Sequence, residues 1–136
     1  MSGRRKLVPN KKPFRLPLGE RGEMVGWDYL RRRGYKILEK NYRTPIGEID
    51  VIAQKDGRIV FLEIKTRSNS SFGRPEESVD TFKQRKLIRI AQWYLKKRKM
   101  EEAAVSFDVL AVDWKGNAEP QMRLIENAFS ADDWLT

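Results

Sequence analysis

Runs of apolar residues bounded by turn formers predict the strands of this chain. Two such runs, 49–52 and 59–64, lie on either side of Asp56-Gly57, a pair typical of a two-residue turn in a β-hairpin. A strand over 35–43 is expected before this hairpin, and Thr44-Pro45-Ile46-Gly47 forms the turn between them. Alternating apolar positions from 105 to 112 predict a fourth strand, and a short fifth strand is expected over 121–125.

Two segments follow the helical period instead. From Gly19 to Arg33 the inward stripe consists of Glu20, Glu23, Trp27 and Leu30, and Gly34 ends the helix. A second helix is expected from Thr81 to Arg98, capped by Asp80 or Ser78. Its buried stripe would hold five residues at the same spacing: Leu87, Ile90, Ala91, Tyr94 and Leu95.

The predicted order of elements is therefore α-β-β-β-α-β-β, typical of one α/β domain. The length of 136 residues suits one domain with a real core. We expect this domain over 19–136, preceded by a basic and flexible tail over 1–18. That tail either contacts phosphates non-specifically or only aids solubility. The polar stretch 67–75 is either a mobile loop over a substrate or a plain surface connection.

The amino-acid composition excludes several kinds of catalytic and metal site. The chain has no His and no Cys, which excludes thiol nucleophiles, disulfides, histidine bases and ordinary zinc sites. No apolar run is long enough to span a membrane and no signal peptide is recognisable, so we expect a cytoplasmic protein with no membrane partner. No glycine loop for a nucleotide cofactor appears either. The net charge of +9 suits a polyanionic partner, although most of it lies in the tail.

The hairpin brings acids together. A two-residue turn at Asp56-Gly57 sets Asp50 directly opposite Glu63 and Glu48 opposite Lys65, all on one face. Like charges at that spacing destabilise a strand pair, so the pairing suggests a missing cation. Hard cations such as Mg²⁺ and Mn²⁺ prefer carboxylate oxygens, and a lysine beside the metal can stabilise charge on a phosphate. This arrangement is typical of a phosphodiester hydrolase.

The ordinary interpretation competes with this one. A Glu-x-Lys on a strand is common by chance, and Glu48 with Lys65 can form an exposed ion pair worth under roughly 1 kcal/mol. Against it, both strands are apolar on their two faces, where charges are costly unless they are paired or bound to metal.

Three further side chains are candidates for the site, and two of them, Glu23 and Lys83, have a second interpretation. Glu23 lies on the inward stripe of its helix, either at the rim or pointing into a site. Lys83 and Gln84 lie in the first turns of the second helix, where an amine and an amide can bind a phosphate. The same lysine also belongs to a basic run that is equally typical of a solvated face.

Several motifs in this order resemble a known family. They are Gly19-Glu20, Gly22-Glu23, Gly34-Tyr35, Asn41-Tyr42-Arg43, Gly47-Glu48-Ile49-Asp50, Phe61-Leu62-Glu63-Ile64-Lys65-Thr66-Arg67, Lys83, Phe107-Asp108 and Asn127-Ala128-Phe129. Together they resemble the bacterial YraN-like uncharacterised family, within the PD-(D/E)xK nuclease superfamily of restriction enzymes and Holliday-junction resolvases. The resemblance implies a restriction endonuclease-like, three-layer α/β core with a mixed sheet.

The same resemblance implies roles for individual residues. Asp50 and Glu63, with the Ile64 carbonyl, would bind Mg²⁺ or Mn²⁺, and Lys65 would assist the attacking water. Glu23 would stand near the metal. Four more residues are expected to contact the substrate: Lys83, Gln84, Arg67 and Glu48.

The leading hypothesis is a metal-dependent endonuclease acting on DNA, including branched or recombination intermediates. Junction cleavage would favour a homodimer on symmetry grounds. The first alternative is a nucleic-acid-binding module that keeps the fold without turnover. The second is a scaffold whose charged cluster is merely a network of ion pairs.

Overall fold

A computed structural model describes residues 16–68, 79–116 and 118–134. The predicted basic tail lies almost wholly outside these residues, as do Ser78 and most of the polar stretch 67–75. Two helices, five strands and a short 3-10 helix follow one another along the described chain. They are α1 (Leu18–Arg32), β1 (Lys36–Thr44), β2 (Gly47–Lys55), β3 (Arg58–Arg67), α2 (Thr81–Lys97), β4 (Ala104–Asp113), β5 (Gln121–Phe129) and η2 (Ala131–Trp134).

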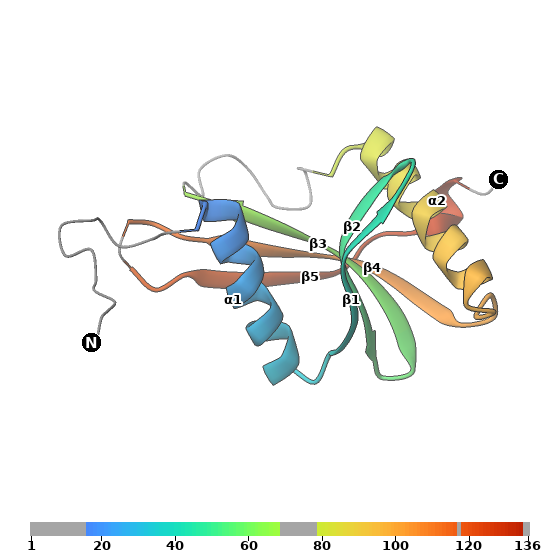
Figure 1. The fold of residues 1–136 in the computed structure, drawn as a ribbon, viewed down its shortest axis with the longest axis horizontal. Coiled ribbons are helices and arrows are strands. Elements are labelled where there is room, and N and C mark those ends of the chain that lie inside the picture. Colours follow the sequence, from blue (N-terminus) through green and yellow to red (C-terminus); the bar gives the residue numbers. More distant parts are fainter. Residues whose placement is uncertain (1–15, 69–78, 117, 135–136) are drawn as a thin grey trace, which may run out of the picture.

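The strands form one mixed sheet in the order β1-β2-β3-β4-β5 (Figure 1). Neighbouring strands are antiparallel except β3 and β4, which are parallel and are connected by α2. The predicted α/β class and the order α-β-β-β-α-β-β are thereby confirmed. The last strand is longer than expected, because it extends beyond Ile125 to Phe129, whose ring stacks on that of Phe107 with centroids 4.9 Å apart.

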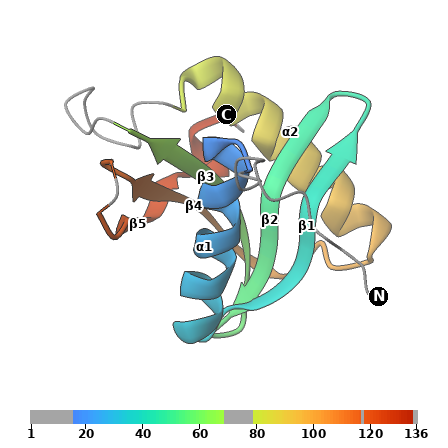
Figure 2. The ribbon, with the colours of Figure 1, turned by 60° about the vertical axis from the view of Figure 1, so that its left-hand side comes forward.

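The two helices cover opposite faces of the sheet (Figure 2). On the side of α1 a cluster of buried residues surrounds Leu30, and on the side of α2 another surrounds Ile90. Each β3 residue from Ile59 to Ile64 is buried, so this strand lies at the centre of the three layers. Within the described residues, no helix combines the length and apolar character that crossing a bilayer requires.

The β2–β3 hairpin has the predicted register. Lys55 pairs with Arg58 and the ladder continues to Val51 opposite Leu62. At the turn Asp56 and Gly57 both have positive φ values, +50° and +77°, as a two-residue turn of this type requires. The turn chemistry alone therefore fixes which residues of β2 and β3 lie opposite one another.

Beyond Val51 and Leu62 the two strands separate. β2 continues its pairing with β1 as far as Gly47, and the tip of this second hairpin bends toward α2 while β3 runs the other way (Figures 1 and 2). Asn41 of β1, with φ of +51°, lies between Lys40 and Tyr42, which pair with Val51 and Ile49 of β2. Asp50 and Glu63 therefore have the expected register but stand at a fork between strands, one step past the end of the ladder.

The buried face of α1 differs from the predicted stripe. Leu30 is buried as expected, but Glu20 is exposed and Trp27 is only partly buried. The residues that press against the sheet are Gly22 and Gly26. A Cβ at Gly22 would stand 2.7 Å from the Cβ of Thr66, and one at Gly26 would stand 3.1 Å from Ile64 Cδ1. Two missing side chains thus let α1 lie close to β3, the strand that carries Glu63.

We expect Gly22→Ala to destabilise the protein by about 1–3 kcal/mol, because the added methyl group overlaps Thr66 and forces α1 away from the sheet. Gly19→Ala is the matched control in the same helix, since a Cβ there meets no atom within 4 Å. That change should be neutral or stabilising, because alanine is the better helix former. Urea unfolding of both variants measures the difference, and equal stability of the two would contradict the close approach.

Candidate metal and phosphate site

The fork between β2 and β3 contains a polar hollow of about 450 Å³. Asp50 of β2 and Glu63 of β3 face it, and the start of α2 closes one side. It is lined by four acids, two lysines, a glycine and an aromatic ring: Glu48, Asp50, Glu63, Asp80, Lys83, Lys86, Gly47 and Phe82. The strand separation thus creates the space, and the hairpin register places the acids in it.

The Asp50 side chain accepts a backbone hydrogen bond that β2 would accept if the ladder continued. Its Oδ2 accepts the backbone N–H of Ile64 at 2.8 Å, a group that a continued ladder would have paired with β2. Burial raises the pKa of Asp50 to about 7, and the negative charge of Glu63 adds to the effect. The Ile64 hydrogen bond and the Lys83 cation oppose this rise without cancelling it. This carboxylate is therefore short of positive charge.

Glu63 is 5 % exposed and forms an ion pair with Lys83, whose Nζ lies 2.7 Å from Oε2. The lysine reaches the acid because Asp80 caps α2 by accepting the Lys83 N–H at 2.9 Å, which begins the helix at the fork. Burial by itself would lower the pKa of Lys83, but the hydrogen bond and charge of Glu63 outweigh it, so its pKa is raised. Lys83 is therefore a fixed cation at the fork.

Lys65 stands two residues beyond Glu63 on β3. Burial lowers the pKa of this ammonium, and the nearby Lys83 cation lowers it further, while Glu63 and Asp50 act in the opposite direction. No acid of the described residues lies within ion-pair distance of Lys65. This amine is thus close to the acids and yet uncommitted to either of them.

Glu48 and Glu23 lie on the outer side of the fork. Glu48 forms an ion pair with Arg43 of β1 at 2.9 Å, so the expected alternative, a pair with Lys65, is not formed. Glu23 of α1 lines a neighbouring hollow with Glu48 and Asn41. Partial burial raises the pKa of Glu23, the charge of Glu48 adds to this, and a hydrogen bond from Asn41 opposes it. The helix therefore brings Glu23 to the edge of the cluster.

Two of the predicted substrate contacts have other partners. The Gln84 amide donates to the Val79 carbonyl at 3.0 Å, which fixes the approach to α2. Arg67 binds both carboxylate oxygens of Asp113 on β4, at 2.8 and 3.2 Å. Neither residue lines the hollow at the fork. The structure brings together Asp50, Glu63, Lys65 and Lys83, with Glu48 and Glu23 beside them.

The oxygen atoms at the fork resemble a magnesium site, in which the protein supplies only some of the metal's ligands. In the described part of the chain, no three acidic side chains are arranged so that they could hold a metal ion by themselves. Mg²⁺ commonly takes one or two carboxylates and completes its shell with waters and substrate phosphates. Since the N–H and C=O of one extended residue point to the same side, the Ile64 carbonyl faces Asp50. Asp50, Glu63 and this carbonyl therefore fit the expected ligands.

Three other residues at the site were given no role from the sequence. Phe82 and Lys86 line the hollow one turn apart on α2, and Asn41 binds Glu23. The signal for Asn41 was its place in the motif Asn41-Tyr42-Arg43. For Phe82 the signal was an aromatic residue in the first turn of a helix, on the side away from the buried stripe.

The protein should lose stability as the pH rises from about 4 to about 7. The raised pKa of Asp50 means that the folded protein keeps a proton that the unfolded chain releases in this range. Asp50→Asn removes the titration and keeps the Ile64 hydrogen bond. Near pH 8 we expect its Tm to exceed that of the wild type by roughly 3–5 °C, which is about 1 kcal/mol in a domain of this size.

Asp28→Asn is the control, because Asp28 is exposed and its ion pair with Arg32 lies on the helix surface. It should reproduce the wild-type pH profile. Calorimetric scans across this pH range measure all three proteins, and an Asp50→Asn profile as steep as the wild type would contradict the assignment.

Comparison with known proteins places the chain among relatives of similar length. Residues 22–112 match the model of the uncharacterised protein family UPF0102. A UPF0102 protein of Syntrophotalea carbinolica is 44% identical over 120 residues, which cover 88% of this chain and 97% of that protein. One from Thermodesulfovibrio yellowstonii is 48% identical over 115 residues, with 85% and 97% covered. The predicted resemblance to the YraN-like family is confirmed, and the chain belongs to the family UPF0102.

Proposed function

We propose that this protein is a metal-dependent endonuclease that hydrolyses phosphodiester bonds of DNA, including branched or recombination intermediates. The observation that carries the proposal is the position of Asp50 and Glu63 at the fork, with a shortage of positive charge on Asp50. A divalent cation relieves that shortage directly. The superfamily resemblance adds the Glu63-x-Lys65 spacing on a central strand.

The residues at the fork would have two roles: some would bind the metal, and Lys65 would stabilise charge on the phosphate. Asp50, Glu63 and the Ile64 carbonyl would hold Mg²⁺ or Mn²⁺, and Ile64 N–H keeps the Asp50 carboxylate oriented. When bound, the metal would polarise the phosphate and lower the pKa of a coordinated water. Lys65, which has no ion-pair partner among the described acids, stabilises charge on the phosphate or orients the water.

Lys83 favours a second candidate function. Its ammonium already compensates Glu63 at 2.7 Å, so half of the acid pair is neutralised by the protein itself. A chain that bound DNA without cutting it would have the same fold and the same ion pair. Under this alternative the cluster holds β3 and α2 together, and the nucleic acid binds through exposed basic side chains of α2 such as Arg89 and Lys96.

Cleavage assays distinguish the two functions. With Mg²⁺ or Mn²⁺, the purified protein should cut at least one of linear, flapped or four-way DNA. Asp50→Asn, Glu63→Gln and Lys65→Met should each lower the rate by at least about 10²-fold, because each removes a ligand or a charge that acts on the phosphate. Quantitative gel assays under single-turnover conditions give these rates.

Glu126→Gln and Lys36→Met are the matched controls, because both residues are exposed and lie away from the fork. These variants should cut at the wild-type rate. Activity that persists in the three fork variants would come from a contaminant, and binding without any cleavage would select the second function. A four-way junction presents two equivalent strands to cut. Activity on it would therefore favour a two-fold symmetric homodimer.

A further inference from the structure

A second hollow lies beside the fork, on the other side of the contact between the β1–β2 turn and α2. Gly47 makes this contact: a Cβ there would stand 2.9 Å from Lys86 Cδ and 3.3 Å from Ile90 Cδ1. The second hollow has a volume of about 400 Å³, within the range of ligand pockets. Seven residues of the turn and of α2 line it: Thr44, Pro45, Ile46, Arg89, Gln92, Trp93 and Lys96.

Exposed apolar side chains concentrate at the two hollows. The described residues expose four large apolar side chains, Met24, Ile46, Phe82 and Trp93. Three of them line the fork or the second hollow. Phe82 is 70 % exposed and Trp93 is 55 % exposed, which is costly for aromatic rings unless something covers them.

The face of α2 that carries these rings is strongly basic. From Thr81 to Arg98 the chain has seven lysine and arginine residues and no acidic residue. Lys86, Arg89, Trp93 and Lys96 follow three- and four-residue spacing, so they share one face. No acid of the described residues forms an ion pair with Arg89 or Lys96. This face complements a chain of negative charges.

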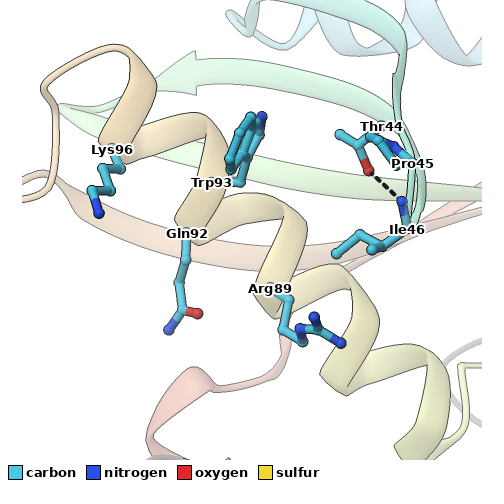
Figure 3. A pocket seen from close by; sticks show the side chains of 7 residues that line it. All are labelled: Thr44, Pro45, Ile46, Arg89, Gln92, Trp93 and Lys96. Atoms are coloured by element: carbon cyan, nitrogen blue, oxygen red, sulfur yellow. Dashed lines mark hydrogen bonds between the residues drawn. The ribbon is translucent and has the colours of Figure 1, made fainter.

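The hollow has aromatic and aliphatic side chains in its lining. Figure 3 shows the Trp93 indole on the hairpin side of α2 and the Ile46 side chain reaching toward α2 from the turn. Thr44 holds that turn in place, because its hydroxyl donates to the Gly47 carbonyl at 2.8 Å and accepts the Ile46 N–H at 3.2 Å. The lining therefore combines an aromatic side chain from α2 with an aliphatic one from the turn.

We propose that this second hollow binds an unpaired base, stacked on Trp93, of a nucleic acid strand whose phosphates lie along the basic face of α2. Aromatic stacking beside a positively charged track is the general way in which proteins hold single strands. The bases of a duplex are stacked on one another and offer no free face to Trp93. The positive charge of α2 favours a polyanionic ligand, and the Trp93 ring favours a polyanion whose bases are unpaired.

The inference rests on the proposed function, because it assigns a substrate feature to the same DNA site. Lys83 and Trp93 are ten residues apart on α2, which is about 15 Å, or the length of roughly four stacked nucleotides. The strand at the fork and the unpaired base would thus belong to one substrate. Substrates with an unpaired segment about four nucleotides from the cleaved bond are the class that this spacing favours.

The test measures binding without cleavage. Full-length protein in EDTA is titrated against a fluorescent homothymidine strand of about 20 nucleotides and against an abasic strand of the same length. Trp93→Ala should weaken binding of the thymidine strand by at least about fivefold, and Trp93→Phe should retain most of the affinity. Affinity for the abasic strand should be nearly equal in all variants. Met24→Ala, which removes an exposed apolar side chain from α1, is the matched control.

Salt dependence tests the phosphate track separately. Arg89→Ala and Lys96→Ala should each reduce the slope of log affinity against log salt by about one, and Arg31→Ala on the surface of α1 should leave it unchanged.

Three results would overturn the inference. The first is equal binding of the thymidine strand by wild type, Trp93→Ala and Trp93→Leu, and the second is failure of the wild type to bind it at all. The third is full affinity in Trp93→Leu alone, which would exclude stacking and indicate an apolar contact in its place. The proposed function fails by a different result, namely no cleavage with metal, which these binding measurements do not involve.

Discussion

The separation of β2 from β3 is the constraint on which the rest of this structure depends. Beyond Val51 and Leu62 the sheet stops pairing these strands, and the polar backbone of Ile64 needs a new partner. Asp50 supplies it, which brings this carboxylate beside the buried Glu63. Two acids in a partly desolvated place repel one another, so positive charge must come from elsewhere. The ion pair between Lys83 and Glu63 meets part of that need, and it fixes where α2 must begin. The position of one helix thus follows from the point at which two strands separate.

The sequence specified the local part of this arrangement and not the long-range part. Asp56-Gly57 determines the hairpin register through the geometry of four residues, and a period of two then carries the register to Asp50 and Glu63. Past the end of that ladder, Gly47 of β2 contacts α2, and Asp50 of β2 accepts the Ile64 N–H of β3. Those contacts join residues that are distant along the chain, so no pattern of apolar and polar positions contains them. For the same reason the sequence left open an ion pair between Glu48 and Lys65 as the competing interpretation, whereas Glu48 pairs with Arg43 across the β1–β2 hairpin.

Helix α1 shows a second limit of hydrophobic patterning. A hydrophobic pattern is carried by side chains, so the pattern of α1 indicated a stripe through Glu20 and Trp27 and contained no sign of Gly22 and Gly26. In the structure the glycines form the buried face because their lack of a side chain permits close approach to Thr66 and Ile64. Two glycines four residues apart in a helix were the available signal. Helix α2 was predicted almost correctly, because its buried stripe consists of large apolar residues and its cap is an ordinary Asp80.

The basic residues of α2 indicate a function only when those with an acidic partner are separated from those without one in the described structure. A row of lysines and arginines is usually a solvated surface, and the sequence by itself leaves that interpretation standing. At the fork the acids explain one cation, since Lys83 compensates Glu63. Arg98 is explained in the same way by Glu39 at 2.9 Å. Arg89 and Lys96 have no such acid among the described residues, and they lie around an exposed tryptophan. Compensation within the protein therefore accounts for Lys83 and Arg98 near the two ends of α2. Under the proposal made above, Arg89 and Lys96 face the phosphates of a bound strand.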